Sequence, residues 1–239
     1  MARQGWRALI PFPRRTTLAR WFPSFETRNI AHLIDRSRAD LLVDIGANEG
    51  QFVRRMRSAG LSLPVLSVEP LEGAHARLRV AAAADPAWTV APRMAVGAAP
   101  GEIQITRYAD ETLSSALPPH PRAVASPALA VVGRETVPRA PLDMILAENP
   151  AQRPFLKLDV QGVEADVIAG GPETLARTAG VLIELSLTPG YDGEAGYLTL
   201  LGTLDRLGFV PVYCAPVTRR RRLGPWLQMD ALLVRREDI

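Results

Sequence analysis

Short apolar runs alternate with stretches of helical spacing from residue 39 to the end of the chain. The clearest apolar runs, each predicted to be a buried strand, occupy residues 41–45, 65–68, 155–160 and 181–186. The stretches predicted to be helices lie at residues 51–59, 71–84, 164–169 and 197–207. Strands that alternate with helices in this way are typical of βαβ units. The pattern therefore predicts an α/β fold built on a doubly wound, mostly parallel sheet.

Weaker patterns fill the rest of the chain. Further strands are predicted at residues 89–96, 102–108, 210–214 and 230–235, and short helices at residues 141–148 and 173–178. Residues 109–140 contain five prolines and show no clear period, so we predict a loop-rich insert that faces the substrate. Residues 1–39 are predicted to form a helical or irregular lead-in, with a helix near residues 27–36, ahead of one domain over residues 40–239.

The composition narrows the class of protein. The chain has 239 residues, of which 47% are hydrophobic, enough for the core of one α/β domain. No apolar run approaches the roughly 18–20 residues that cross a bilayer, and the charged, broken N-terminus does not predict a secretory signal. Cys214 is the only cysteine, which excludes an internal disulfide and a cysteine-rich metal site and favours the reducing cytoplasm. His32, His75 and His120 lie far apart in the sequence, so we expect no metal site.

The basic residues are strongly biased toward arginine. The net charge is only +3, and the 28 basic residues include a single lysine, Lys157. A GC-rich genome explains most of this bias. Where a lysine survives it, we expect a position that a guanidinium does not fit. The run Arg219–Arg222 is expected to be a solvated loop, with an anionic substrate, a lipid headgroup or nucleic acid as the alternative ligand.

The strongest chemical signal is the segment Val-Asp-Ile-Gly-Ala-Asn-Glu-Gly at residues 43–50. A strand that passes through glycines into a helix brings backbone N–H groups close to a ligand. The spacing of Gly46 and Gly50 is Gly-x-x-x-Gly, unlike the Gly-x-Gly-x-x-Gly of dinucleotide sites. A carboxylate at Asp44 repels a pyrophosphate and attracts a cation. The loop therefore favours S-adenosylmethionine, which carries a sulfonium and an ammonium but no phosphate.

A second carboxylate, Glu69, ends the next predicted strand, nineteen residues after Gly50. An acid at this point accepts hydrogen bonds from both hydroxyls of a ribose. NAD-binding proteins use an acid in the same way, so only the combination of Asp44 and Glu69 favours S-adenosylmethionine. The alternative interpretations are a helix N-cap at Asp44 and a solvated strand end at Glu69.

These segments resemble the FkbM family of S-adenosylmethionine-dependent methyltransferases over about residues 40–185. The matching stretches are Val43–Gly50, Val68–Pro70, Ala95–Gly97, Phe155–Glu164 and Val181–Glu184. The glycine loop is common to class I methyltransferases, whereas Lys-x-Asp-Val-x-Gly-x-Glu at residues 157–164 is more specific to the family. The family usually has Glu where this chain has Gln161. This exchange alters either activity and substrate choice or only the solvation of the loop.

The resemblance implies a class I (Rossmann-like) methyltransferase sheet with an antiparallel last strand, in a methyltransferase domain at residues 40–239. It implies S-adenosylmethionine as methyl donor and O-methylation of a hydroxyl on a sugar, glycan or secondary metabolite. The expected cofactor contacts comprise Asp44, Gly46, Ala47, Asn48, Gly50, Glu69, Pro70, Ala95 and Val96. Ala95 and Val96 are expected near the adenine.

Lys157, Asp159 and Glu164 are the candidate catalytic residues. Lys157 and Asp159 are two apart on a predicted strand and share a face, with Asp159 at the end where doubly wound sheets bind ligands. A hydroxyl acceptor loses its proton as it attacks, and Asp159 or Glu164 is predicted to accept or relay that proton. Lys157 then orients the carboxylate or the substrate. Alternatively, Glu164 stabilises the N-terminus of its helix and Lys157 neutralises Asp159 or Glu184.

The remaining polar candidates are weaker. His75 is a further candidate base, although its place in a predicted exposed helix favours a surface role. Asp110, Ser114 and Ser115 lie in the insert, where they either face the substrate or reflect the polarity of a loop. Neither the identity of the acceptor nor the oligomeric state is predicted, because specificity resides in loops such as residues 109–140.

Three other functions are weighed against this one. The arginines and a pI near 9.5 favour a nucleic-acid methyltransferase, but the strand ending at Asp159 lacks the Pro-Pro-aromatic motif for a flipped base. Gln161 allows a non-catalytic protein that retains the fold and binds the cofactor. An NAD-dependent oxidoreductase is disfavoured by the loop spacing and by Asp44. The expected partner is a small-molecule or glycan acceptor, with no dedicated nucleic-acid binding.

Overall fold

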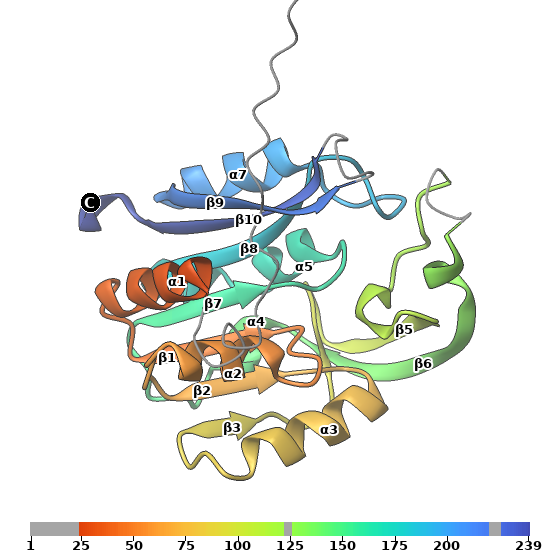
Figure 1. The fold of residues 1–239 in the computed structure, drawn as a ribbon, viewed down its shortest axis with the longest axis horizontal. Helices are drawn as coiled ribbons and strands as arrows, with labels where there is room; N and C mark the ends of the chain where they lie inside the picture. The colour runs from red at the N-terminus through yellow and green to blue at the C-terminus, as the bar shows by residue number, and fades with distance from the viewer. Residues whose placement is uncertain (1–23, 122–125, 220–225) are drawn as a thin grey trace, which may run out of the picture.

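The computed structural model describes residues 24–121, 126–219 and 226–239, and its centre is a seven-stranded sheet (Figure 1). The strands run in the order β3-β2-β1-β7-β8-β10-β9. Their bounds are β1 Leu41–Ile45, β2 Val65–Val68, β3 Trp88–Val90, β7 Pro154–Leu158, β8 Gly180–Ser186, β9 Phe209–Arg219 and β10 Trp226–Arg235. The strands from β3 to β8 pair in parallel, whereas β10 is antiparallel to both β8 and β9. The predicted doubly wound sheet with an antiparallel last strand is confirmed.

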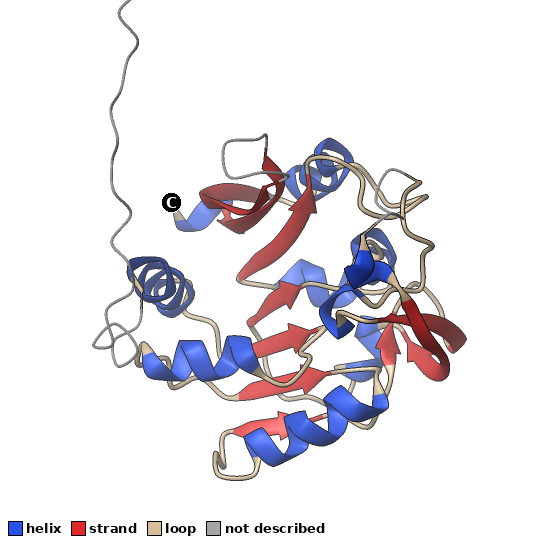
Figure 2. Cartoon of the chain, turned by 45° about the vertical axis from the view of Figure 1, so that its right-hand side comes forward, coloured by secondary structure: helices blue, strands red, loops and turns tan. Residues whose placement is uncertain are grey.

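Helices cover both faces of this sheet (Figure 2). One face carries α1 Phe25–Arg36, α2 Gln51–Ser58 and α3 Glu72–Ala82. The other carries α4 Leu142–Ile145, α5 Glu164–Ala169, α6 Pro172–Arg177 and α7 Tyr197–Arg206. Because successive side chains of a strand point to opposite faces, Leu42 joins the first core while Val43 and Ile45 join the second. Burial on both faces explains why β1 is apolar apart from Asp44 rather than alternating.

Local signals set the ends of the helices. Ser24 caps α1, because its Oγ accepts a hydrogen bond from the Thr27 N–H at 3.1 Å. Ile30 and Ile34 of that helix are buried in the core beneath it. Gly208 follows the end of α7 with a φ of +88°, a conformation that favours glycine. The helices predicted from residues 27, 51, 71, 164 and 197 are all present, with ends shifted by a few residues.

A second, three-stranded sheet lies beyond the C-terminal ends of the parallel strands (Figure 1). It consists of β4 Ala95–Val96, β6 Val131–Ala140 and β5 Gly101–Tyr108, in the order β4-β6-β5. It packs on α3 through a small apolar cluster of Leu71, Ala74, Ala95, Ile105 and Val137. This sheet forms one side of the space above the glycine loop.

Two predictions were wrong in this region. Residues 89–96 do not form one strand, because the chain leaves the large sheet after β3, passes through Pro92, and joins the small sheet as β4. Residues 109–140 are not loop throughout, because their second half is the ten-residue strand β6. Only Val137 of β6 is buried, so this strand has no alternation of apolar residues that the sequence could reveal. The described residues of the first half do form turns, including the 3₁₀ helices η2 Glu111–Leu113 and η3 Pro127–Leu129.

The last two strands are longer than the predicted ranges 210–214 and 230–235, which cover only parts of β9 and β10. Arg219 ends β9, and residues 220–222 of the arginine run lie outside the described residues. Most of the N-terminal lead-in, residues 1–23, also lies outside them. None of the helices in the described part of the chain combines the length and the apolar character needed to cross a membrane.

Candidate active site

A cleft of about 500 Å³ opens where the strand order reverses, at the C-terminal ends of β1 and β7. Doubly wound sheets bind their ligands at such a switch point. The predicted site residues on its wall are Gly46, Ala47, Asn48, Glu69, Pro70, Ala95, Val96, Lys157 and Asp159. The other three, Asp44, Gly50 and Glu164, lie behind the wall. Residues 111–116 of the insert line the opposite side.

The glycine loop has a conformation that its sequence makes possible. Gly46 has a φ of +76°, and a Cβ there would lie 1.9 Å from the carbonyl oxygen of Asp159. Only glycine therefore lets the loop pass this close to the end of β7. Gly50 has a φ of +78° at the start of α2, where a Cβ would lie 2.5 Å from the ring of Trp88. The contacts of Gly50 are thus with the core and not with the cleft.

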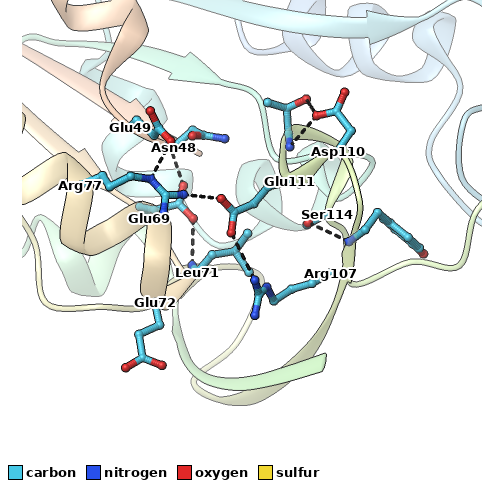
Figure 3. A network of polar contacts seen from close by, with 12 residues as sticks. Asn48, Glu49, Glu69, Leu71, Glu72, Arg77, Arg107, Asp110, Glu111 and Ser114 are labelled. Atoms are coloured by element: carbon cyan, nitrogen blue, oxygen red, sulfur yellow. Dashed lines mark hydrogen bonds and ion pairs between the residues drawn. The ribbon is translucent and has the colours of Figure 1, made fainter. Parts of the chain in front are cut away.

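Glu69 is buried beside this loop, with 4% of its surface exposed. One carboxylate oxygen accepts the Asn48 N–H at 2.7 Å, and the other accepts the Leu71 N–H at 2.8 Å (Figure 3). Burial raises the pKa of Glu69 to about 7, although both hydrogen bonds act in the opposite direction. Each oxygen retains a lone pair for a further donor. The side chain is therefore fixed in place and still able to accept hydrogen bonds from a ligand in the cleft.

Lys157 of β7 connects this strand to its neighbour, β1. Lys157 and Asp44 are directly paired on β7 and β1, and Nζ lies 3.2 Å from Oδ1 of the fully buried Asp44. The same Nζ donates to the Gly46 carbonyl at 2.9 Å and lies 3.3 Å from Oδ2 of Asp159. Burial opposes the charge on Lys157, but the attraction of the two carboxylates outweighs it and raises the pKa of the ammonium. Burial also raises the pKa of Asp44, against the effect of Lys157.

This arrangement explains why the only lysine of the chain stands here. One compact ammonium contacts three oxygens while its side chain is only 9% exposed, and the larger planar guanidinium has a different donor geometry. Lys157 thus pairs with Asp44 and Asp159, with no ion pair to Glu184 among those the structure describes. Asp159 itself follows β7 rather than lying within it, and its side chain is 37% exposed to the cleft.

Glu164 supports the loop that follows Asp159. Its Oε1 accepts the N–H groups of Val160 at 3.2 Å and Gly162 at 3.3 Å, and 6% of the residue is exposed. Burial raises the pKa of this carboxyl group to about 7. Glu164 does stand at the N-terminus of α5, as one interpretation of the sequence holds, but its hydrogen bonds go to the preceding loop.

The insert is attached to the glycine loop by a chain of charges (Figure 3). Arg77 of α3 contacts Glu111 of η2 and lies, through Nε, 2.6 Å from Oε1 of Glu49. Arg107 of β5 continues the chain, with 3.6 Å to Glu111 and 3.4 Å to Glu135 of β6. Sequence reasoning did not find this network, because its members come from five separate segments and each is an ordinary surface residue by type.

Of the weaker candidate residues, some line the cleft and others do not. His75 lies off the cleft wall, with Nε2 2.9 Å from the Ala91 carbonyl oxygen. Asp110 accepts the Thr112 N–H at 3.1 Å and also lies off the wall. Ser114 and Ser115 are both on the wall. Among the described residues, no group of three or more His, Cys, Asp or Glu side chains is arranged to hold a metal ion.

Several cleft residues were missed in the sequence. Glu184 of β8 and Gln228 of β10 line the wall, and Gln228 Nε2 donates to Glu184 Oε2 at 2.9 Å. Burial, followed by repulsion from Asp159 and Asp230, raises the pKa of Glu184 to about 8. Burial raises the pKa of Asp230 to about 6. The available signal was the charged Glu184 within the apolar run of β8, a residue that the sequence suggested only as a partner for Lys157.

The strand order, the antiparallel last strand and the cleft at the switch point define a class I methyltransferase fold. The sequence matches the family described as the methyltransferase FkbM domain over residues 44–211, well over half of the chain. The chain therefore belongs to the FkbM methyltransferase family, which confirms the predicted family and its cofactor, S-adenosylmethionine. Comparison with curated protein sequences finds no match.

Three solved structures with a similar fold are distant in sequence. Magnesium protoporphyrin IX methyltransferase from Synechocystis PCC 6803 is 10% identical to this chain, with a TM-score of 0.48. The alignment covers 88% of this chain and 76% of that enzyme's chain. The N-terminal domain of EvdMO1, solved with S-adenosylhomocysteine bound, is also 10% identical with a TM-score of 0.48, covering 89% and 82%. A putative RNA methyltransferase from Pyrococcus horikoshii is 9% identical with a TM-score of 0.46, covering 88% and 82%. At sequence identities this low, a similar fold says nothing about the reaction or the substrate.

The wall of the cleft fits the cofactor of the family. Glu69 offers carboxylate oxygens at the second strand end, where a ribose needs acceptors. Met94, Ala95 and Val96 contribute an apolar wall beside it, suited to a purine ring. The basic side chains on the wall, Arg55 of α2 and Lys157 of β7, come from outside the glycine loop.

Proposed function

We propose that this protein transfers a methyl group from S-adenosylmethionine to a hydroxyl of a sugar, glycan or secondary metabolite. The observation that carries the proposal is that Glu69 and Asp159, from two different strand ends, open on the same cleft. When bound, S-adenosylmethionine supplies an electrophilic methyl group on its sulfonium. The cleft then needs one end that holds the nucleoside and another that receives the hydroxyl and its proton.

The residues proposed to hold the cofactor lie on the β1, β2 and β4 side. Glu69 accepts hydrogen bonds from the ribose, and Pro70 and Asn48 flank it on the wall. Ala95 and Val96 pack against the adenine. The loop at residues 46–47 offers backbone to the amino-acid end. Asp44 and Gly50 contribute from behind the wall, Asp44 by holding Lys157 and Gly50 by starting α2.

Asp159 is the proposed proton acceptor at the other end. It lines the cleft, whereas Glu164 does not, and Lys157 lies against its Oδ2 at 3.3 Å. Glu164 acts at a distance, by fixing the loop that follows Asp159. General base catalysis of this kind typically contributes about 10²–10⁴ in rate.

The insert is proposed to form the acceptor side of the cleft, through residues 111–116. We also propose that residues 1–39 form a lead-in and that residues 40–239 form the methyltransferase domain. The single cysteine, Cys214, supports the further proposal that the protein works in the reducing cytoplasm.

The experiment is a transfer assay with the full chain and S-adenosylmethionine labelled on its methyl group. Free sugars, nucleotide sugars, oligosaccharides and polyketide alcohols serve as acceptors, with RNA and DNA alongside. We expect transfer to at least one hydroxylated acceptor, and a loss of at least about 100-fold in kcat for Asp159→Asn. Asp110→Asn, which changes a carboxylate off the wall, is the matched control.

Two results would overturn the proposal. Transfer to nucleic acid alone would move the protein to another substrate class. Cofactor binding without transfer to any acceptor would favour a non-catalytic member of the family. Full turnover of Asp159→Asn would remove Asp159 from the role of base while leaving the transfer reaction in place.

A further inference from the structure

Gln161 occupies a constrained position between β7 and α5. Its φ is +56°, and Gly162 follows with a φ of +101°. Positive φ is uncommon for a residue with a side chain and persists only where the surroundings hold it. Here Glu164 does so, since its Oε1 accepts the N–H groups on both sides of Gln161, those of Val160 and Gly162. The loop therefore directs the Gln161 side chain in a fixed way.

The amide of Gln161 joins the ends of two strands. Its Nε2 donates to Oδ1 of Asp159 at 2.7 Å and to Oε2 of Glu184 at 3.3 Å. Asp159 follows β7 and Glu184 belongs to β8, and all three residues line the cleft. The amide nitrogen thus links the two carboxyl groups, which also have separate partners in Lys157 for Asp159 and Gln228 for Glu184.

The same residue also contacts the insert and the loop between β8 and α7. The buried Ser115 of the insert donates its hydroxyl to the main-chain carbonyl of Gln161 at 2.6 Å. The buried Tyr191, from the loop between β8 and α7, lies with its hydroxyl 2.9 Å from Oε1 of Gln161 and 2.7 Å from the carbonyl of Leu113. Four segments of the chain therefore meet at this one residue.

Only an amide satisfies all of these neighbours. The two carboxyl groups accept from the amide N–H groups, the tyrosine proton is shared between the Leu113 carbonyl and the amide oxygen, and a glutamine offers two N–H groups and one carbonyl. A glutamate would offer no donor and would add a third carboxylate within hydrogen-bonding distance of two others. An apolar side chain would leave buried polar groups unpaired, which is costly in a partly enclosed site.

We propose that Gln161 is a positioning residue of the acceptor site: its amide sets Asp159 and Glu184 side by side on the cleft floor and fixes this pair to the insert. The assignment of this end of the cleft to the acceptor rests on the proposed function. The contacts themselves do not. Loss of the amide therefore affects both the protonation of Glu184 and the order of residues 111–117.

A test has to separate the effect of Gln161 on the pKa of Glu184 from the effects of the charged groups around Glu184. They are Asp159 at the end of β7, Asp230 of β10, Glu164 of α5 and Lys157 of β7. Gln228 of β10 provides the matched control, because it also donates to Glu184 Oε2, at 2.9 Å, but has no hydrogen bond to the insert among the described contacts. A Gln228 variant removes one donor to the acid and leaves the connection to the insert intact.

The experiment follows the Glu184 carboxyl carbon by ¹³C NMR during a pH titration, with the resonance assigned through Glu184→Gln. In Gln161→Leu the titration midpoint of Glu184 is expected to rise by about one pH unit, since a donor to the ionised form is lost. In Gln161→Glu it is expected to rise further. Hydrogen exchange of residues 111–117 is expected to speed up at least 10-fold in both variants, whereas Gln228→Leu raises the midpoint and leaves that exchange unchanged.

Tyr191→Phe keeps the amide of Gln161 and removes only its hydrogen bond to the tyrosine hydroxyl. This variant replaces the Gln161 variants in the experiment if they do not fold. It is expected to speed exchange of residues 111–117 with less than half the shift of the Glu184 midpoint. An unchanged Glu184 midpoint in folded Gln161 variants, or unchanged exchange of the insert in these and in Tyr191→Phe, would overturn the proposal. Binding of S-adenosylhomocysteine to the unaltered protein, measured in parallel, tests the proposed function separately.

Discussion

The two halves of the cleft are built in different ways. The proposed cofactor half comes from residues 45–48, 68–71 and 94–96, each next to the end of a strand, and its acid, Glu69, is held by backbone N–H groups. The acceptor half is assembled from distant segments, as the contacts of Ser115 and Tyr191 with Gln161 illustrate. Its acids are held by side chains. Backbone donors persist whatever residue is present, whereas side-chain donors change with every substitution, so the acceptor half is the part that sequence change can alter freely.

Lys157 is the contact that joins the two halves, and its loss has the largest expected effect. Lys157→Met leaves the fully buried Asp44 without its ion-pair partner, which costs about 3–5 kcal/mol of folding free energy. Urea unfolding measures this loss. The double variant Asp44→Asn, Lys157→Met removes the uncompensated charge and is expected to regain most of the stability. Equal instability of the single and double variants would contradict the importance assigned to this ion pair.

The glycine loop provides the next largest effect. Gly46→Ala introduces a Cβ 1.9 Å from the Asp159 carbonyl oxygen at a φ of +76°, so we expect a loss of about 2–4 kcal/mol together with weaker binding of S-adenosylhomocysteine. Gly60 also has a positive φ, +93°, but a Cβ there meets nothing within 4 Å. Gly60→Ala therefore isolates the conformational cost, about 1 kcal/mol. If thermal and urea unfolding give the two variants the same stability, the close approach of the loop to β7 is wrong.

The smallest effect is expected at the edge where the halves meet. Arg77 has a side chain that is 48% exposed, so Arg77→Met is expected to change the folding free energy by less than about 1 kcal/mol. It removes both ion pairs that connect Glu111 and Glu49, so hydrogen exchange of residues 111–113 is expected to accelerate, and we expect the same acceleration in the unaltered protein at 0.5 M salt. Arg236→Met, which breaks an exposed pair with Asp205, is the control and leaves that exchange unchanged.

The comparison also separates what the sequence could predict from what it could not. The cofactor half follows from local pattern, because an apolar run such as residues 41–45, a glycine turn and an acid at the next strand end are read from consecutive residues. The seven-stranded sheet follows for the same reason. In contrast, β6 was missed because its exposed faces carry no alternation, and the division of residues 89–96 depends on which sheet each part joins.

The acceptor half shows the same limit at the level of side chains. Lys157 and Asp159 were found because they are two apart on one strand, but their shared partner, Asp44, is set by the register between β1 and β7. The roles of Gln161 and Glu184 depend on contacts across 23 positions or more. No local pattern encodes a hydrogen bond of that kind. The sequence therefore showed only that Gln161 replaces the Glu that is usual in the family, and not what its side chain contacts.

Isothermal titration calorimetry with S-adenosylhomocysteine tests the central claim most directly, namely that Glu69 is the acid that holds the nucleoside. Its pKa is raised to about 7 by burial, and ribose hydroxyls stabilise the ionised form, so binding is coupled to loss of a proton. Affinity is therefore expected to increase about 10-fold from pH 6 to pH 8, because the ionised fraction rises over that range. Glu69→Gln is expected to bind more weakly at pH 8 and to lose this dependence, while Glu72→Gln, an exposed neighbour, retains both. Absence of binding to the unaltered protein, or an unchanged affinity and pH dependence in Glu69→Gln, would contradict the account.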